Sequence, residues 1–158
     1  MSNEIKDGLP DEALILRLRS TEHDFVERKS KSDKGGWLQA VVAFANSTPI
    51  GWPAFLFVGV DNDGKPQQGP DKLEDLAKSV SDILEHAYPA MYRHIQPLHF
   101  PEGGACLAVI VPGSEARPHF AGKSYVRVGP QTKEASESQF DLLIAERQSK
   151  VRRLTGPN

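Results

Sequence analysis

The segment from Ala54 to Val60 places the strongest constraint on the fold of this chain. It is a nearly continuous apolar run rich in Phe and Val, without alternating polar positions. Such a run is typical of a central strand that is buried on both faces, because a strand with one solvated face alternates apolar and polar residues. The chain must therefore cover both faces of the sheet that contains this strand. Asp61 follows directly, and Asn62-Asp63-Gly64 predicts a turn, since these residues tolerate positive φ.

The remaining apolar residues predict four helices and four further strands. Apolar residues recur at helical spacing in four stretches, which are 11–18, 37–46, 71–87 and 135–153. Shorter runs bounded by polar, Gly or Pro residues predict strands at 25–29, 95–100, 105–111 and 124–128. The order of elements is not a regular alternation of strand and helix, so the pattern predicts an α+β fold with a mixed, largely antiparallel sheet flanked by helices.

Length and composition narrow the class of protein. A chain of 158 residues is most simply one domain, here with a core at about residues 10–148 and a basic C-terminal tail at 149–158. The longest uninterrupted apolar run, Ala54 to Val58, is too short to span a bilayer, so a soluble, cytoplasmic protein without membrane contact is expected. The net charge of −2 provides no overall attraction to a polyanion. Any binding of nucleic acid must therefore depend on local clusters of basic residues.

Several common functional sites have no support in the sequence. Cys106 is the only cysteine, which excludes an intrachain disulfide and a cysteine cluster for zinc. The five histidines lack the spacing of metal ligands. The stretch Gly122-Lys123-Ser124 resembles the end of a phosphate-binding loop, but it lacks the upstream glycine and a following helix. The chain contains no Gly-x-Ser-x-Gly motif of a serine hydrolase.

Carboxylates at the ends of two predicted strands are the main candidates for chemistry. Glu22, Glu27 and Asp61 can supply oxygen ligands, which suit Mg²⁺ or Mn²⁺, and a metal held beside a phosphodiester can activate water for hydrolysis. Lys29 lies two residues after Glu27 and therefore on the same face of the strand, where it can orient water or stabilise charge. The alternative is that Glu27 and Lys29 form an ordinary exposed pair of well under ~1 kcal/mol. Convergence of the three carboxylates on one point would favour the metal site.

The order of these motifs resembles one known family. Over about Leu14 to Ile144 the chain resembles the Schlafen AlbA-like domain family, and the resemblance rests on Glu22, Glu27-x-Lys29, Ala43-Phe44-Ala45-Asn46, Phe57-Val58-Gly59-Val60-Asp61 and Tyr125-Val126-Arg127-Val128-Gly129. It implies a domain associated with nucleic acid and, as in animal Schlafens, a metal-dependent endoribonuclease that acts on structured RNA. The implied catalytic acids are Glu22, Glu27 and a third acid at Asp61 or at the neighbouring position, Asn62. Bacterial members of the family are described as DNA-binding or transcription-regulator modules.

Local clusters of basic residues complete the functional prediction. Arg28, Lys31, Lys34 and Arg127 are predicted to contact phosphates of RNA or DNA, although a solvated surface is the simpler alternative. The sequence therefore predicts a nucleic-acid-binding domain with metal-dependent endoribonuclease activity as a further expectation. A non-catalytic DNA-binding regulatory or protein-interaction module is the alternative. Homo-oligomerisation is left open.

Overall fold

The structure is a computed structural model that describes residues 8–20 and 23–155, with side chains described through residue 148. Its described helices are α2 (Asp11–Leu18), α3 (Lys34–Ser47), α4 (Leu73–Leu84), α5 (Glu137–Thr155) and the short 3-10 helix η1 (Pro70–Lys72). Its strands are β1 (Val26–Lys29), β2 (Pro53–Val58), β3 (His94–His99), β4 (Ala105–Pro112), β5 (Tyr125–Val128) and β6 (Gln131–Glu134).

Four of the strands form the main sheet in the order β1-β2-β4-β3. The edge strand β1 pairs parallel with β2, and the other two pairings are antiparallel, which confirms the predicted mixed, largely antiparallel sheet in an α+β domain. Strands β5 and β6 form a separate two-stranded hairpin. Strand β6 was not predicted, because Gln131–Glu134 is polar throughout and carries no apolar alternation.

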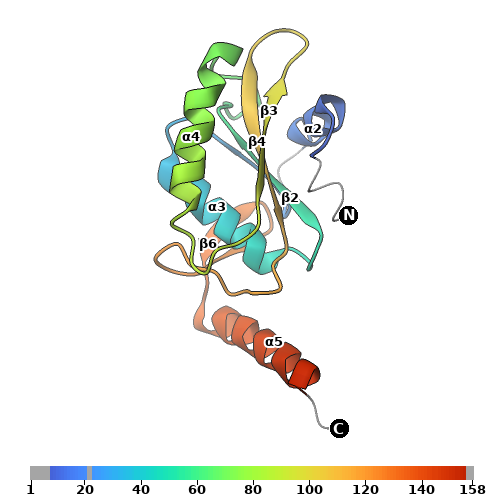
Figure 1. Ribbon diagram of the computed structural model, residues 1–158, viewed down its shortest axis with the longest axis vertical. Helices are drawn as coiled ribbons and strands as arrows, with labels where there is room; N and C mark the ends of the chain where they lie inside the picture. The colour runs from blue at the N-terminus through green and yellow to red at the C-terminus, as the bar shows by residue number, and fades with distance from the viewer. Residues whose placement is uncertain (1–7, 21–22, 156–158) are drawn as a thin grey trace.

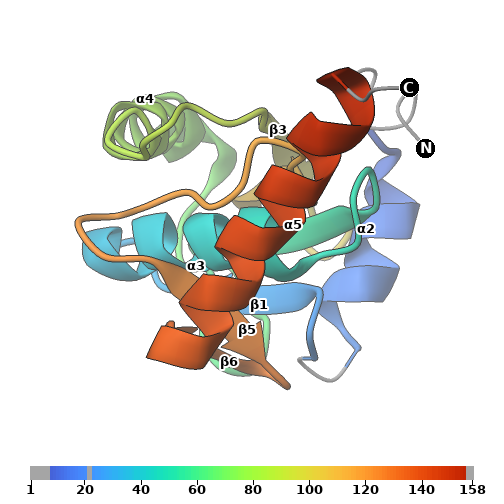
Figure 2. The same cartoon turned by 90° about the horizontal axis from the view of Figure 1, so that it is seen from below.

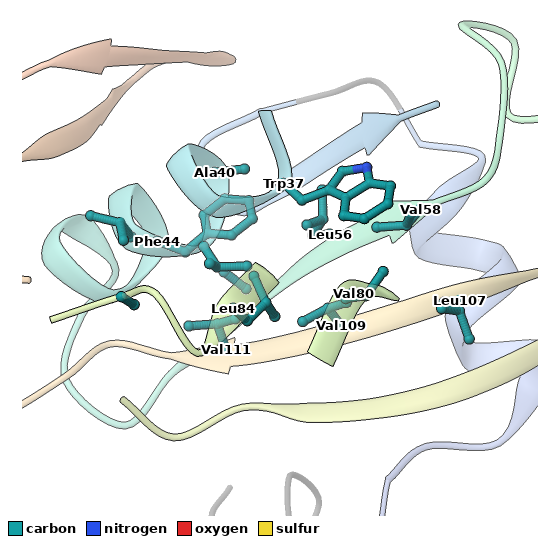
Figure 3. Packing of buried hydrophobic residues seen from close by; sticks show 14 of the residues in the cluster. Trp37, Ala40, Phe44, Leu56, Val58, Val80, Leu84, Leu107, Val109 and Val111 are labelled. Carbon is teal, nitrogen blue, oxygen red and sulfur yellow. The ribbon is translucent and has the colours of Figure 1, made fainter. Parts of the chain in front are cut away.

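Helices cover the main sheet on both faces, as the apolar run of β2 requires. Figure 1 shows α3 and α4 on one face and α2 on the other. Leu56 and Val58 pack toward α3 and α4, whereas Phe55 and Phe57 face α2. Figure 3 shows the larger core, where side chains of α3 and α4 meet those of β2 and β4; it includes Trp37, Ala40, Phe44, Leu56, Val58, Val80, Leu84, Leu107, Val109 and Val111.

Helix α3 begins three residues earlier than the sequence pattern predicted. Asp33 is its N-cap, and the Asp33 carboxylate accepts a hydrogen bond from the amide of Gly36 at 3.2 Å. This satisfies an amide that would otherwise lack a partner in the first turn of the helix. The cap therefore starts the helix at Lys34, before the first apolar residue. The indole of Trp37 donates to the Ser30 carbonyl at 2.9 Å, which ties the helix to the loop after β1.

Helix α5 lies at the end of the sheet where α4 ends, and β5 and β6 lie beside α3 and β1 (Figure 2). The first half of α5 packs on the loop that follows β4. Leu143 is buried, the rings of Phe140 and Phe120 are 5.9 Å apart, and Glu146 pairs with Arg117 at 3.2 Å. No helix within residues 8–20 and 23–155 is both long and apolar enough to cross a membrane.

Candidate nucleic-acid interface

Glu27 lies in the edge strand β1, but its side chain is enclosed. The residue is only 7 % exposed, because β1 turns its odd-numbered side chains toward α3 and the β5–β6 hairpin. One carboxylate oxygen forms an ion pair with Arg127, and the other lies 3.4 Å from the ammonium of Lys29. The prediction that Lys29 lies on the same face as Glu27 is confirmed. The alternative that Glu27 is an exposed strand residue is wrong.

Arg127 closes this side of the sheet. Its side chain is 1 % exposed, and the guanidinium donates to the carbonyls of His23 and Val26 at 2.7 and 3.2 Å. It also donates to the Thr132 hydroxyl at 2.9 Å and lies 5.0 Å from the centre of the Phe44 ring. Because β1 is an edge strand, the bond to Val26 satisfies a carbonyl that has no neighbouring strand. The sequence placed Arg127 on a phosphate-binding surface, whereas the structure places its guanidinium inside.

Asp61 is part of a tight turn after β2. One of its carboxylate oxygens accepts hydrogen bonds from the amides of Asp63 and Lys65, both at 2.9 Å. Gly64 in the same turn has a φ of +80°, a conformation that glycine adopts without steric cost. Asn62, the alternative third position, is exposed in this turn. The predicted turn is thus confirmed, and Asp61 stabilises it.

Arg28 connects this turn to the opposite face of β1. Its guanidinium donates to the carbonyls of Leu18 and Ser20 at 3.2 Å, and its Nε donates to the Asn62 carbonyl at 3.5 Å. Val26, the neighbouring even-numbered residue, packs with the residues beneath α2. The even-numbered side chains of β1 thus face α2, away from Glu27 and Lys29. No hydrogen bond or ion pair among the described residues joins Asp61 to Glu27.

The described residues do not fit a Mg²⁺ or Mn²⁺ site. Both oxygens of Glu27 face cationic partners, and one oxygen of Asp61 already accepts two amides. Glu22 lies outside the described residues. In the described part of the chain, no three His, Cys, Asp or Glu side chains are placed to hold a metal ion. The metal and catalytic roles of Glu22, Glu27, Asp61 and Lys29 remain predictions.

Exposed lysines gather at the end of the sheet where the parallel strands β1 and β2 terminate. They come from the loops that follow the two strands and from the first residues of α3 and η1–α4, and they are Lys31, Lys34, Lys65 and Lys72. None of these ammonium groups has a carboxylate partner among the described residues. We call these four residues the lysine edge. Helix α4 and the residue that caps its C-terminus carry several exposed acids, namely Glu74, Asp75, Asp82 and Glu85.

Comparisons with known proteins identify the family. The family model described as "Schlafen, AlbA_2" matches residues 20–136. The chain belongs to this family. The matched region ends at the last residue before α5, so it contains β1, the lysine edge and the Arg127 hairpin of the AlbA-like domain. No curated protein matches the chain.

Two solved structures share the fold. One is the N-terminal domain of an ATP-dependent DNA helicase RecG-related protein from Nitrosomonas europaea, with a TM-score of 0.57 and 24 % identity; the match covers 82 % of this chain and 95 % of that one. The other is the DIP2311 protein from Corynebacterium diphtheriae, with a TM-score of 0.54 and 16 % identity; that match covers 82 % of this chain but 26 % of the other. The AlbA-like domain thus spans about a quarter of that longer chain.

A buried polar network that the sequence pattern did not reveal holds the hairpin against α3. Asn46 is 2 % exposed; its amide donates to the carbonyls of Tyr125 and His119 at 2.8 and 3.1 Å, and it accepts from the His119 amide at 2.7 Å. The His119 ring lies 2.6 Å from the Pro89 carbonyl and 2.7 Å from the Ser114 hydroxyl. The only signal in the sequence was an asparagine at the end of an otherwise apolar helical stretch.

The stability of the domain is expected to fall as the pH drops below about 6.5, the ordinary pKa of histidine. Burial lowers the pKa of His119; the Pro89 carbonyl opposes this shift, while Arg147 and Arg117 add to it. The unfolded chain therefore takes up this proton at a higher pH than the folded one, so the contribution is complete above 6.5 and is lost as the pH falls toward the lowered folded-state value. Urea midpoints at pH 7.5, 6.5 and 5.5 measure it. His119→Gln should flatten this dependence, and an equal slope in both proteins would contradict the assignment.

Proposed function

We propose that this domain binds nucleic acid along the lysine edge, with Lys31 and Lys34 as phosphate contacts. The observation that carries the proposal is the group of exposed ammonium groups without carboxylate partners at the ends of β1 and β2. Two of the acids near this edge already have partners: Glu27 is paired with Arg127, and Asp33 caps α3 and lies 3.6 Å from the Lys29 ammonium. Contacts between lysines and the phosphate backbone supply most of the sequence-independent affinity of a protein for nucleic acid.

The family assignment supports the same proposal. The Schlafen AlbA-like family is associated with nucleic acid. A similar fold also occurs at the N-terminus of a protein described as related to a DNA helicase. Arg127 and Arg28, also predicted to contact phosphates, have guanidinium groups that donate to backbone carbonyls. The proposed contacts therefore centre on lysines rather than on these two arginines.

We further propose that this domain binds nucleic acid without metal-dependent cleavage. The endoribonuclease activity that the family resemblance implies would need carboxylates free to coordinate Mg²⁺ or Mn²⁺. Glu27 and Asp61 are instead engaged with Arg127, Lys29 and the amides of a turn. Incubation with labelled tRNA, single-stranded RNA and DNA in Mn²⁺, Mg²⁺ or chelator tests this proposal. Cleavage products that disappear with chelator would contradict it and would restore the nuclease hypothesis.

Binding should weaken steeply with salt. Each phosphate neutralised by a lysine contributes about −0.7 to −0.9 to the slope of log affinity against log salt. The double substitution Lys31→Glu and Lys34→Glu should reduce the affinity roughly 10- to 100-fold at low salt and flatten this slope. Position 34 is the first residue of helix α3, where a negative charge interacts favourably with the helix dipole, so Lys34→Glu is not expected to destabilise the fold. Fluorescence anisotropy with labelled RNA and DNA measures both quantities.

Lys78→Glu is the matched control for this experiment. Lys78 is also exposed, but it lies on the acidic helix α4 outside the lysine edge. This variant should bind with nearly unchanged affinity. Equal losses of binding free energy per substituted lysine in Lys78→Glu and in the double variant would show that only net charge matters, and would exclude the lysine edge as the interface.

A further inference from the structure

A pocket of about 300 Å³ opens beside the lysine edge. It lies outside the carboxyl ends of the parallel strands β1 and β2, which is the general position of ligand sites in open sheets with parallel strands. Its volume is at the lower end of the range for sites that hold small molecules. Its walls come from the loop after β1, the loop before η1, η1 itself and the first turns of α4. The lining residues are Lys31, Gln68, Lys72, Asp75, Leu76 and Ser79.

The pocket walls combine cationic, anionic, hydroxyl and apolar side chains. Lys31 and Lys72 bring two ammonium groups to one pocket, and neither pairs with a carboxylate among the described residues. Asp75 and Ser79 supply a carboxylate and a hydroxyl, and the half-buried Leu76 adds an apolar surface. Such a mixture of an apolar wall with a few polar groups is typical of sites for small organic ligands.

Gln68 lines the pocket and connects two strands of the main sheet. Its side-chain amide donates to the carbonyls of Gly59 and Ala105, which joins the end of β2 to the start of β4. The amide oxygen of Gln68 is buried and has no hydrogen-bond partner. On the same loop, the side chain of Gln67 accepts from the amide of Lys31 at 2.9 Å, so the loop after β1 is held against the pocket. The pocket is therefore a preformed feature of the fold.

We propose that this pocket holds one nucleotide unit, with its phosphate between Lys31 and Lys72 and its sugar hydroxyls at Asp75 and Ser79. Ammonium groups recognise phosphate, and a carboxylate accepts hydrogen bonds from ribose hydroxyls, which favours ribose over deoxyribose. The inference rests on the proposed function in one respect, since Lys31 and Lys72 belong to both sites. The nucleotide comes either from a bound strand or from a free nucleoside monophosphate, and the experiment separates these two sources.

Calorimetric titration with adenosine 5′-monophosphate tests the pocket directly. Binding is expected, with adenosine, inorganic phosphate and the deoxy nucleotide each weaker. Lys72→Ala should lower the affinity roughly 10-fold, the effect of one charge-assisted hydrogen bond. Lys78→Ala, in the adjoining helix α4 but outside the pocket, should leave the affinity unchanged. No binding, equal binding of adenosine, or an affinity insensitive to Lys72→Ala would overturn the inference.

A second variant separates the pocket from the wider interface. Ser79→Phe fills the pocket from α4, and it should abolish binding of the nucleotide while weakening single-stranded RNA only a few-fold. If RNA binds through Lys34 but the nucleotide does not bind, the pocket inference fails and the proposed function stands. If the nucleotide binds and no strand does, the ligand is a free nucleotide and the proposed function fails. Thermal melting checks that Ser79→Phe is folded. Lys72→Ala tests nucleotide binding by the pocket at an exposed residue, where the substitution is not expected to affect folding.

Discussion

Replacing Glu27 by glutamine is expected to destabilise the domain by about 3 kcal/mol, since removing one partner of a buried ion pair leaves the other charge unpaired. The side chain of Arg127 is 1 % exposed, so water cannot take the place of the lost carboxylate. Glutamine keeps the shape and one acceptor, which places the effect at the lower end of the range for broken buried pairs. For a domain of this size the melting temperature should fall by roughly 6–12 °C.

An exposed pair of the same chemistry provides the control for this prediction. Glu102 and Arg19 form an ion pair in which both side chains are 56 % exposed. Glu102→Gln should change the free energy of unfolding by under about 1 kcal/mol, because exposed pairs are solvated and screened. A double-mutant cycle with Arg127→Met should show that the two buried substitutions are not additive. Equal effects of Glu27→Gln and Glu102→Gln would show that the buried pair contributes no more than the exposed one.

This prediction changes how a test for catalysis must be designed. Glu27→Gln removes a predicted catalytic carboxylate, but Glu27 also holds Arg127, which donates to the carbonyls of His23 and Val26. Loss of activity in this variant would therefore not identify Glu27 as a catalytic residue. Activity has to be compared well below the melting temperature of the variant, together with Asp61→Asn.

The second large effect is expected at Asn46. Asn46→Ala removes the donors to Tyr125 and His119 and the acceptor for the His119 amide, all in a buried site. Each buried polar group left without a partner costs about 1–3 kcal/mol, so a total loss of roughly 2–4 kcal/mol is expected after partial relaxation. Urea unfolding measures this loss. Asn46→Asp is the isosteric test, since it keeps an acceptor but loses both donors.

Asn62→Ala is the control for the buried asparagine. The Asn62 side chain is exposed, and a surface substitution of this kind is expected to change stability by no more than about 0.5 kcal/mol. If Asn46→Ala were as mild as Asn62→Ala, the network around His119 would not hold the hairpin. The pH dependence assigned to His119 should also weaken in Asn46→Ala, because both residues belong to one hydrogen-bonded unit.

Local sequence patterns predicted most of the fold. The apolar run through β2 required cover on both faces of the sheet, and α2 on one side with α3 and α4 on the other provide it. Where the prediction failed, the local signal was absent. The polar strand β6 is held by pairing with β5, and the start of α3 is set by the cap at Asp33.

The candidate site was less predictable than the fold. Periodicity correctly placed Glu27 and Lys29 on one face, because the side chains of a strand alternate with a period of two. The periodicity gave no information on which side chains pack against Glu27 and Lys29. Burial depends on β5, whose pairing with β6 and packing on α3 bring Arg127 over the edge of β1. Lys31 and Lys34 need no such partner, and the prediction that they contact phosphate stays a prediction.

By itself, the sequence determined where α2–α5 and β1–β5 lie, that the central strand is covered on both faces, and that neither an intrachain disulfide nor a cysteine cluster for zinc can form. These properties follow from the spacing of neighbouring residues and from composition. Only the tertiary structure decided that Glu27 is paired with Arg127, 100 positions away, and that Asn46 holds His119, 73 positions away. The physical reason is that the charge state and accessibility of a side chain depend on the groups packed against it. In this domain those groups come from distant parts of the chain.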